Sequence, residues 1–306
     1  MNVAFIGAVQ GSATALEALI RAGKAPGLVV TLPPSSAARH SDYADLRPLA
    51  EEAGASLVLA ANINSPEVIG ALRDFGTDIA LVVGWSQICH EAFRAAPRIG
   101  CIGFHPAPLP RLRGRAVIPW TILLGATSTA ATLFWLDDGV DSGPILLQEH
   151  IAVAPDETAL SLYAKQTGAL ARMLPRAVDL AASATPPRIE QDHSEATYCA
   201  KRTPDDGLID WRDSSEAILR LIRAAGEPYP GAFTTLGNSR LIVDAAAPFA
   251  ESYRFHGLAG QIQCHTPDGF AVRCGDGACI QITQWRDTQS RGRPPVHAKL
   301  GGWLPS

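Results

Sequence analysis

The sequence has few of the features that mark metal sites, disulfide frameworks and membrane segments. Its six cysteines are scattered and never form a CxxC pair, which argues against a zinc site or a set of disulfides. No apolar run approaches the roughly 20 residues that a membrane helix needs. The 26 basic residues are outnumbered by 30 acidic ones, so the chain has no overall positive field for a polyanion. We therefore expect no metal and no membrane span, and nucleic acid is disfavoured as a partner.

Two further signals are absent or incomplete near the amino terminus. The opening MNVAFIGAVQ has no basic leader and begins directly with a buried-strand pattern, so a secretory signal is not expected and we place the protein in the cytoplasm. Gly7 and Gly11 are present, but the dinucleotide motif GxGxxG is not. We expect these glycines to allow a tight turn between a strand and a helix, and a dinucleotide site is the weaker alternative.

The first half of the chain alternates short apolar runs with amphipathic segments. At 306 residues the chain is long for a single core, so two domains are expected. Apolar runs such as VAFIGA and DIALVVGW predict strands, and the segments between them, such as SATALEALIRAG and SPEVIGALRDFG, predict helices. This alternation predicts an α/β fold with a Rossmann-like, doubly wound parallel sheet. TSTAATLFWL continues the strands, and a long amphipathic helix from ETALSLY onward closes the domain.

The pattern changes after this helix. The stretch ATPPRIEQDHSEATYC is polar, contains prolines and lacks periodicity, which predicts a linker. Beyond it, one helix (SSEAILRLIRAAG) precedes short β segments separated by turns, which predicts a smaller OB-like β-barrel domain. The expected division is a Rossmann-like domain at residues 1–183, a linker at 184–200 and the OB-like domain at 201–306. Edge strands of the barrel leave a homodimer open without specifying one.

One histidine and one aspartate lie where such a sheet places its ligands. His105 follows the strand CIGF, and open α/β sheets bind ligands outside the carboxyl ends of their strands. Asp141 lies in DDGVDSG after the next predicted strand, and adjacent parallel strands would bring the two loops together. The carboxylate could then hold His105 in one tautomer and stabilise its charged form. Asp137 and Asp138 compete for this role, because aspartates before glycine also form turns.

Three stretches resemble motifs of folate-dependent formyltransferases. HPAPLPRLRGRAVIPW resembles the family signature HPSLLPxxRGxxPixW, and DDGVDSGPILLQ resembles the family's DxGxDTGxil loop. KRTPDDGLIDW with LIRAAGEPYPGAF is similar to the start of the family's C-terminal domain. The likeness, which includes the methionyl-tRNA formyltransferases, covers nearly the whole chain in the family's order. It implies a Rossmann-like catalytic domain, 10-formyltetrahydrofolate as donor and an amine as the usual acceptor.

The resemblance also implies roles for individual residues. It assigns His105 to the family's catalytic histidine and Asp141 to its catalytic aspartate, and a histidine suits the proton transfer from the attacking amine to the departing folate nitrogen. Residues implied to bind the folate are Gly84, Trp85, Ser86, Gln87, Ile88, Asp138 and Gly139. Residues expected on the acceptor side are Gly103, Arg113, Gly114 and Arg115. The two arginines either hold a phosphate or carboxylate or belong to a solvated loop.

The sequence departs from the family at two positions. Most members carry an asparagine two residues before the histidine, where its amide can donate to the tetrahedral oxyanion, but this chain has Gly103. Removing one such donor costs about 3 kcal/mol of transition-state stabilisation. Either His105 and backbone N–H groups replace it, or the reaction has changed. Ala107 stands where serine is common, which removes one expected hydrogen bond to the ligand.

The acceptor is left open between several classes. Transfer-RNA formyltransferases resemble this chain in architecture, but they usually carry a basic insertion after the second strand. At this place the present chain reads TLPPSSAARHSDYADL, whose only basic side chains are Arg39 and His40. Two such residues are a poor basis for RNA binding. SDYADL, VVGWSQIC and CGDGACIQI resemble enzymes that formylate amino sugars on nucleotides. The leading hypothesis is therefore an N-formyltransferase for a nucleotide-linked amino sugar or another small amine. The alternatives are a 10-formyltetrahydrofolate hydrolase, supported by Gly103, a methionyl-tRNA formyltransferase, and a non-catalytic folate-binding module, which the intact His105 and Asp141 disfavour.

Overall fold

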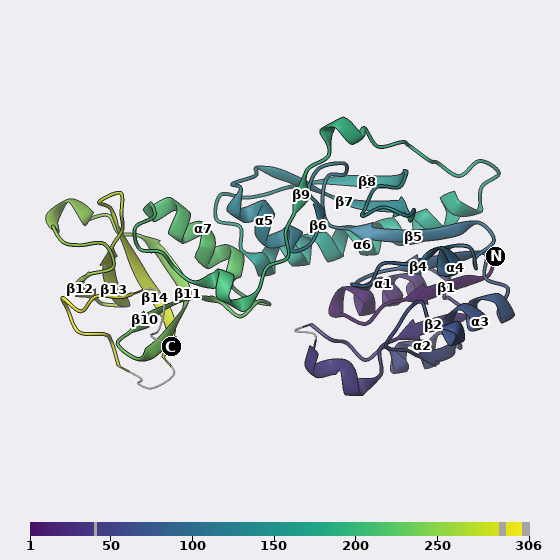
Figure 1. The fold of residues 1–306 in the computed structure, drawn as a ribbon, viewed down its shortest axis with the longest axis horizontal. Helices are drawn as coiled ribbons and strands as arrows, with labels where there is room; N and C mark the ends of the chain where they lie inside the picture. Colours follow the sequence, from purple (N-terminus) through teal and green to yellow (C-terminus); the bar gives the residue numbers. More distant parts are fainter. Residues whose placement is uncertain (40–41, 288–291, 302–306) are drawn as a thin grey trace. The chain divides into compact units, whose positions relative to one another are not determined.

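The chain folds into two compact units. The computed structural model describes residues 1–39, 42–287 and 292–301 (Figure 1); His40, considered above for RNA binding, lies outside these ranges. The first unit comprises Met1–Val117, Ser128–Ala152 and Tyr163–Ala200. The second comprises Ile118–Thr127, Val153–Leu162 and the chain from Lys201 onward. Within the described ranges, no helix combines the length and the apolar character needed to cross a bilayer.

The first unit is built on a seven-stranded sheet with the order β3-β2-β1-β4-β5-β7-β8. Its strands are β1 (Val3–Ile6), β2 (Leu28–Thr31), β3 (Ser56–Leu59), β4 (Ile79–Val82), β5 (Gly100–His105), β7 (Ser128–Trp135) and β8 (Ile145–Ala152). The five strands from β3 to β5 run parallel. β1, β2 and β4 are apolar four-residue runs that are buried along their whole length, as expected of strands covered on both faces.

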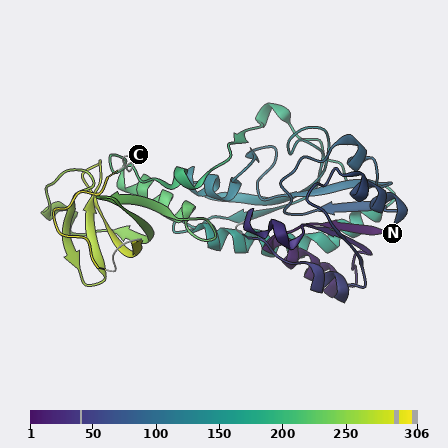
Figure 2. The ribbon, with the colours of Figure 1, turned by 60° about the horizontal axis from the view of Figure 1, so that its bottom comes forward.

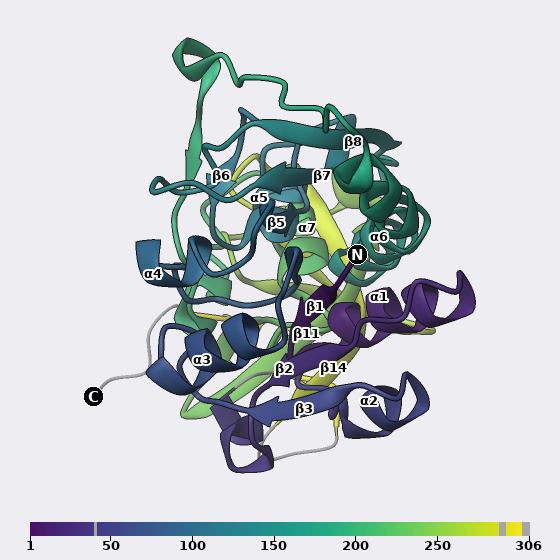
Figure 3. The same ribbon diagram turned by 90° about the vertical axis from the view of Figure 1, so that its right-hand side faces the viewer.

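Helices cover both faces of this sheet (Figure 3). Phe5 and Leu81 pack into a core with α1 (Gln10–Arg21), α2 (Arg47–Glu52) and α6 (Ala159–Ala182). Their neighbours Ile6 and Val82 point to the other face and pack with α3 (Pro66–Asp74) and α4 (Glu91–Arg94). The two faces alternate because successive side chains of a strand point to opposite sides. The predicted Rossmann-like α/β architecture is confirmed, although α2 is shorter than the expected DYADLRPLAEEAG helix.

The edge of the sheet that carries the motif residues is antiparallel, which corrects the expectation of parallel strands there. β7 runs antiparallel to β5, with Ile102 opposite Trp135 and His105 opposite Thr132, and β8 runs antiparallel to β7. The carboxyl end of β7 therefore lies beside the start of β5. The hairpin loop at residues 136–144 turns back toward the carboxyl end of β5, and only this return brings Asp141 near His105.

The segment that the sequence predicts as a linker packs within the first unit. Trp135 donates from its indole nitrogen to the Pro187 carbonyl at 2.8 Å, and Ile189 forms a bridge with Ile145. The short 3-10 helix η2 (His193–Glu195) comes next in the chain. After it, the short strand β9 (Tyr198–Cys199) pairs with β6 (Arg113–Gly114). In Figure 1 this green segment runs above β8 and then turns down to β9. We call residues 187–199 the strap.

The second unit contains a five-stranded antiparallel sheet with the order β10-β11-β14-β13-β12 (Figure 2). The strands are β10 (Ala232–Leu236), β11 (Ser239–Pro248), β12 (Ile262–Thr266), β13 (Gly269–Arg273) and β14 (Cys279–Asp287). Residues 297–301 bond to both edges, because Ala298 accepts from Ile262 while Gly301 exchanges two bonds with Thr235. The helix α7 (Ser215–Ala225) packs Ile218 and Ile222 against the sheet. The predicted separate β domain is confirmed.

Burial in the central strands predicts that two leucines of the same sheet contribute very differently to the free energy of unfolding. Leu81 of β4 is fully buried, whereas Leu59 of the edge strand β3 is 40% exposed. Leu81→Ala is expected to lower the free energy of unfolding by about 2–5 kcal/mol, because it leaves a cavity between the sheet and the helices α1, α2 and α6. Leu59→Ala, the matched control, should change it by about 0.5 kcal/mol. Urea unfolding followed by circular dichroism measures both, and equal losses would contradict this description of the core.

Candidate active site

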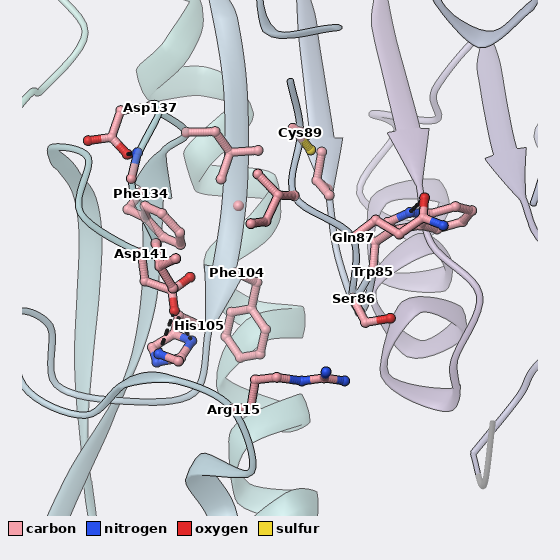
Figure 4. Close-up of a pocket in the computed structure, with 18 of the residues that line it drawn as sticks. Trp85, Ser86, Gln87, Cys89, Phe104, His105, Arg115, Phe134, Asp137 and Asp141 are labelled. Atoms are coloured by element: carbon pink, nitrogen blue, oxygen red, sulfur yellow. Dashed lines mark hydrogen bonds and ion pairs between the residues drawn. The ribbon is translucent and has the colours of Figure 1, made fainter. Parts of the chain in front are cut away.

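A cavity of about 660 Å³ opens at the carboxyl ends of β4 and β5 in the first unit. Four stretches supply most of its lining: the loop at residues 84–89, the end of β5 at 103–105, residues 114–116, and the end of β7 with the hairpin loop. Val9 and Asp42 on the side of α1, and Val82 at the end of β4, complete it. Its volume falls in the usual range for small-molecule and cofactor sites. Figure 4 shows His105 and Asp141 on one side and Trp85, Ser86 and Gln87 on the other.

His105 ends β5 and is held by a backbone carbonyl. The side chain is only 5% exposed, and its Nε2 atom lies 2.7 Å from the Leu112 carbonyl oxygen. Because a carbonyl oxygen can only accept, this contact places the hydrogen of the neutral ring on Nε2 and leaves the lone pair on Nδ1. Nδ1 lies 3.6 Å from the Asp141 Oδ2 atom, an ion-pair distance when the ring is protonated.

Asp141 is held in an uncommon backbone conformation. Its φ angle is 52°, and its Oδ2 atom accepts a hydrogen bond from the Gly114 N–H at 2.8 Å. Leu112 and Ala116 also have positive φ angles, of 59° and 54°. Residues that carry a Cβ atom adopt this region far less often than glycine, and such strain gathers at functional sites where surrounding contacts enforce it. The structure thus brings the two sequence-predicted catalytic residues together on strained loops.

The loop at residues 84–89 is rigidly fastened to its neighbours. Gly84 has a φ of 66°, and a Cβ atom there would lie 2.3 Å from a methyl of Val9, so no other residue fits. The Gln87 amide accepts from Ile63 N–H and from the Trp85 indole, and donates to the Ala61 carbonyl. Gln87 lines the cavity as predicted, but its amide oxygen and nitrogen are bonded to Ile63, Trp85 and Ala61 and so hold the loop in place.

The same loop is pinned from outside the cavity by a residue that the sequence analysis missed. The Asn64 side chain donates to the Ile88 carbonyl at 2.8 Å and accepts from the His90 N–H at 2.7 Å. Ile88 therefore stays 59% exposed at the cavity wall. Only an asparagine shortly before a predicted helix marked this position, and that signal also fits an ordinary turn.

Cys89 lines the cavity without being a nucleophile. Burial raises the pKa of its thiol to about 12, so the thiol stays protonated at neutral pH. Because the thiolate is the reactive form, this side chain contributes an apolar surface.

Gly103 lies at the cavity wall, in a space that other side chains fill. A Cβ atom built there would lie 2.6 Å from the Leu136 Cδ2 atom and 3.1 Å from the Phe134 ring. Both side chains line the same cavity. The glycine is therefore matched to Phe134 and Leu136, and the position cannot take an amide side chain unless they move.

Two of the predicted site residues, Arg113 and Asp138, do not line the cavity. Arg113 is only 2% exposed and its guanidinium is bonded to Gln191, so burial removes it from any ligand. Asp138 is exposed at the tip of the hairpin loop, and Asp137 takes its place in the lining. The remaining predicted residues line the cavity: Gly84, Trp85, Ser86, Gln87, Ile88, Gly103, His105, Gly114, Arg115, Gly139 and Asp141.

Ten lining residues were not among the predicted site residues, and of these only Asp137 was considered from the sequence, as a competitor of Asp141. They are Val9, Asp42, Val82, Cys89, Phe104, Ala116, Phe134, Leu136, Asp137 and Val140. Three of them, Val82, Phe104 and Phe134, are apolar strand residues whose hydrophobic pattern indicates only burial. In the described part of the chain, no cluster of three or more His, Cys, Asp or Glu side chains is arranged to hold a metal ion.

Both halves of the chain match models of one protein family. The formyl transferase model matches residues 1–178, and the formyl transferase C-terminal domain model matches residues 201–299.

Individual relatives agree with these matches. A methionyl-tRNA formyltransferase of Geobacter metallireducens is 31% identical over 98% of this chain and 94% of its own. Another of Sorangium cellulosum is 34% identical over 97% of this chain and 94% of its own. A sugar 3N-formyl transferase, solved in the presence of dTDP and 5-N-formyl-THF, has a similar fold, with a TM-score of 0.66 and 14% identity over 95% of this chain and 98% of its own. The chain therefore belongs to the formyl transferase family.

Proposed function

We propose that this protein transfers the formyl group of 10-formyltetrahydrofolate to the amino group of a small molecule, with His105 and Asp141 as its catalytic residues. The observation that carries the proposal is the geometry of this pair. A buried imidazole with one fixed tautomer faces a carboxylate inside a cavity of about 660 Å³. Family membership supports the reaction class.

The cavity fits a folate donor on the side of the loop at residues 84–89. This side combines the backbone of a fixed loop with the exposed Ile88 side chain and the neutral Cys89 thiol. A flat heterocycle needs apolar surface for its faces and backbone polar groups for its edges, and few other groups. The bound donor supplies the formyl carbonyl that the amine attacks.

His105 is suited to take up the proton that the attacking amine loses. Because the Leu112 carbonyl occupies Nε2, the lone pair on Nδ1 receives the proton. The Asp141 carboxylate, 3.6 Å away, stabilises the imidazolium that forms. Nδ1 then returns the proton to the departing folate nitrogen. With glycine at position 103, negative charge on the formyl oxygen is left to protonated His105 and to backbone N–H groups.

A small anionic acceptor, such as an amino sugar linked to a nucleotide, is supported by Arg115. This exposed side chain lines the cavity and extends across it toward Ser86 (Figure 4). No hydrogen bond or ion pair engages its guanidinium among the described residues, so it is free to bind a phosphate or carboxylate.

Charge distribution in the second unit disfavours a transfer-RNA acceptor. Residues 201–306 contain twelve Lys and Arg against eleven Asp and Glu, which gives no strong basic field. Four arginines there already pair with carboxylates: Arg212 with Asp210, Arg220 with Glu216, Arg254 with Glu251 and Arg286 with Asp244. The names of the curated relatives favour methionyl-tRNA, which is therefore the second candidate.

A panel of acceptors tests the proposed function. The protein is incubated with 10-formyltetrahydrofolate and, separately, nucleotide-linked amino sugars, formyl-accepting transfer RNA, or no acceptor. With a small amine as acceptor, we expect a product about 28 mass units heavier than the amine. This is the mass of CO, because a formyl group replaces one hydrogen atom of the amino group. Formylated RNA as the only product would favour the second candidate. Formate released without acceptor would favour hydrolysis, for which Gly103 is the support.

The catalytic assignment is tested by substitution of each partner. His105→Ala and Asp141→Asn are each expected to lower kcat at least about a hundredfold, the scale of general acid–base groups. His150→Ala, which changes an exposed histidine of β8, is the control and should keep kcat within about twofold. Steady-state kinetics measure all three, and near-normal turnover of His105→Ala or Asp141→Asn would show that the residue is misassigned.

The filled space beside Gly103 gives a third prediction. Gly103→Asn is expected to lower kcat about tenfold or more, because its Cβ meets Leu136 and Phe134 and displaces the wall of the cavity. Adding Leu136→Ala should recover part of the loss by providing space. An activity gain from Gly103→Asn alone would mean that the position only lacks its amide donor.

A further inference from the structure

The two loops that carry the catalytic pair are joined by a buried contact with the strap. Gln191, on the strap, is 5% exposed and lies 50 residues from Asp141 in the sequence. Its Nε2 group donates to the Asp141 carbonyl at 2.9 Å and to the Gly143 carbonyl at 2.7 Å. Both N–H groups of the amide are therefore spent on the hairpin loop that holds Asp141.

The oxygen of the same amide faces the other loop. Gln191 Oε1 accepts from Arg113 Nη2 at 2.6 Å and from Arg113 Nε at 3.2 Å. The amide cannot be reversed, because its NH₂ group would then face the Arg113 donors and its oxygen would face two carbonyl oxygens. One side chain thus fixes the distance between the hairpin loop and the loop after β5.

Arg113 is a buried cation held by neutral partners. Besides Gln191, it donates to the His193 Nδ1 atom at 3.1 Å and to the Tyr198 hydroxyl at 3.3 Å. Both partners belong to the strap, and β9 pairs with β6 beside them. A buried guanidinium is costly unless its N–H groups are bonded, so its position is strongly determined by these contacts.

The residues on either side of Arg113 hold the catalytic pair directly. The Leu112 carbonyl binds His105 at Nε2, and the Gly114 N–H binds the Asp141 carboxylate. Since these three residues are consecutive, fixing the Arg113 side chain also fixes the two backbone groups that orient the pair. Leu112 and Asp141 both have φ angles in the left-handed region. Without the contacts of Arg113 and Gln191, the backbone at these two residues would relax to a more favourable conformation.

We propose that Gln191 and Arg113 are positioning residues, which set the geometry of the His105–Asp141 pair by joining its two loops. The proposal rests on the catalytic roles proposed above. Neither side chain lines the cavity, so neither contacts a ligand there. Their effect is on the rate of the chemical step, because small displacements of catalytic groups reduce turnover strongly while substrate contacts remain.

A double-mutant cycle between Gln191 and Asp141 tests the proposal in the full-length protein. Gln191→Leu is expected to lower kcat at least about tenfold, with the KM of the donor and of the acceptor within about threefold. In an Asp141→Asn background, the same substitution should lower kcat less than about twofold further, because the group that Gln191 positions is already disabled. A merely structural role would give the same loss in both backgrounds.

The control and the fold are measured in parallel. Glu195→Gln removes the exposed ion pair between the strap and Arg111, a contact that does not reach the catalytic pair, and should keep kcat within about twofold. Thermal unfolding checks every variant. If Gln191→Leu does not fold, Gln191→Glu replaces it in the cycle, because it keeps an oxygen facing Arg113 and puts a carboxylate oxygen, which cannot donate, against the Asp141 and Gly143 carbonyls.

Three outcomes overturn the proposal. Unchanged kcat in Gln191→Leu, with Asp141→Asn impaired, refutes the positioning role alone. Equal losses in both backgrounds show that Gln191 does not act through Asp141. Unimpaired Asp141→Asn refutes the catalytic assignment as well, so the two failures are distinguishable.

Discussion

The hydrogen bond between His105 Nε2 and the Leu112 carbonyl is the contact on which the chemistry of the site depends. It decides which ring nitrogen is protonated in the resting state, and so leaves Nδ1 to face Asp141. The bond exists only because the chain after β5 returns toward the strand and presents Leu112 with a φ of 59°. The contact between His105 and Asp141 is therefore a property of loop conformation, and the sheet supplies only the fixed end from which His105 projects.

Much of the fold follows from the sequence because its signals are local. Four-residue apolar runs such as Val3–Ile6 and Ile79–Val82 are buried strands, and the helical stripes between them cover both sheet faces. The direction of β7 and β8 does not follow, because a strand has the same hydrophobic pattern in either direction. The expectation of parallel strands at this edge failed for that reason, although the motif still located His105 and Asp141.

The site was predictable where a motif named a residue and unpredictable where a distant partner decides its role. Arg113 has a side chain that can bind an anion, but Gln191, 78 residues later, holds it in the interior. Gln191 itself lies in a polar, aperiodic stretch whose pattern indicates a linker. Gly103 illustrates the same limit, since only the positions of Phe134 and Leu136 show that a Cβ atom there would meet their side chains.

The course of the strap has a practical consequence for dissecting the molecule. A fragment that stops at residue 183, where the amphipathic helix ends and the aperiodic stretch begins, would keep every strand of the seven-stranded sheet and the side chains of His105 and Asp141. It would nevertheless lack β9 and the amide that spans the two loops. The first compact unit therefore extends to residue 200, past the point that hydrophobic patterning alone would choose.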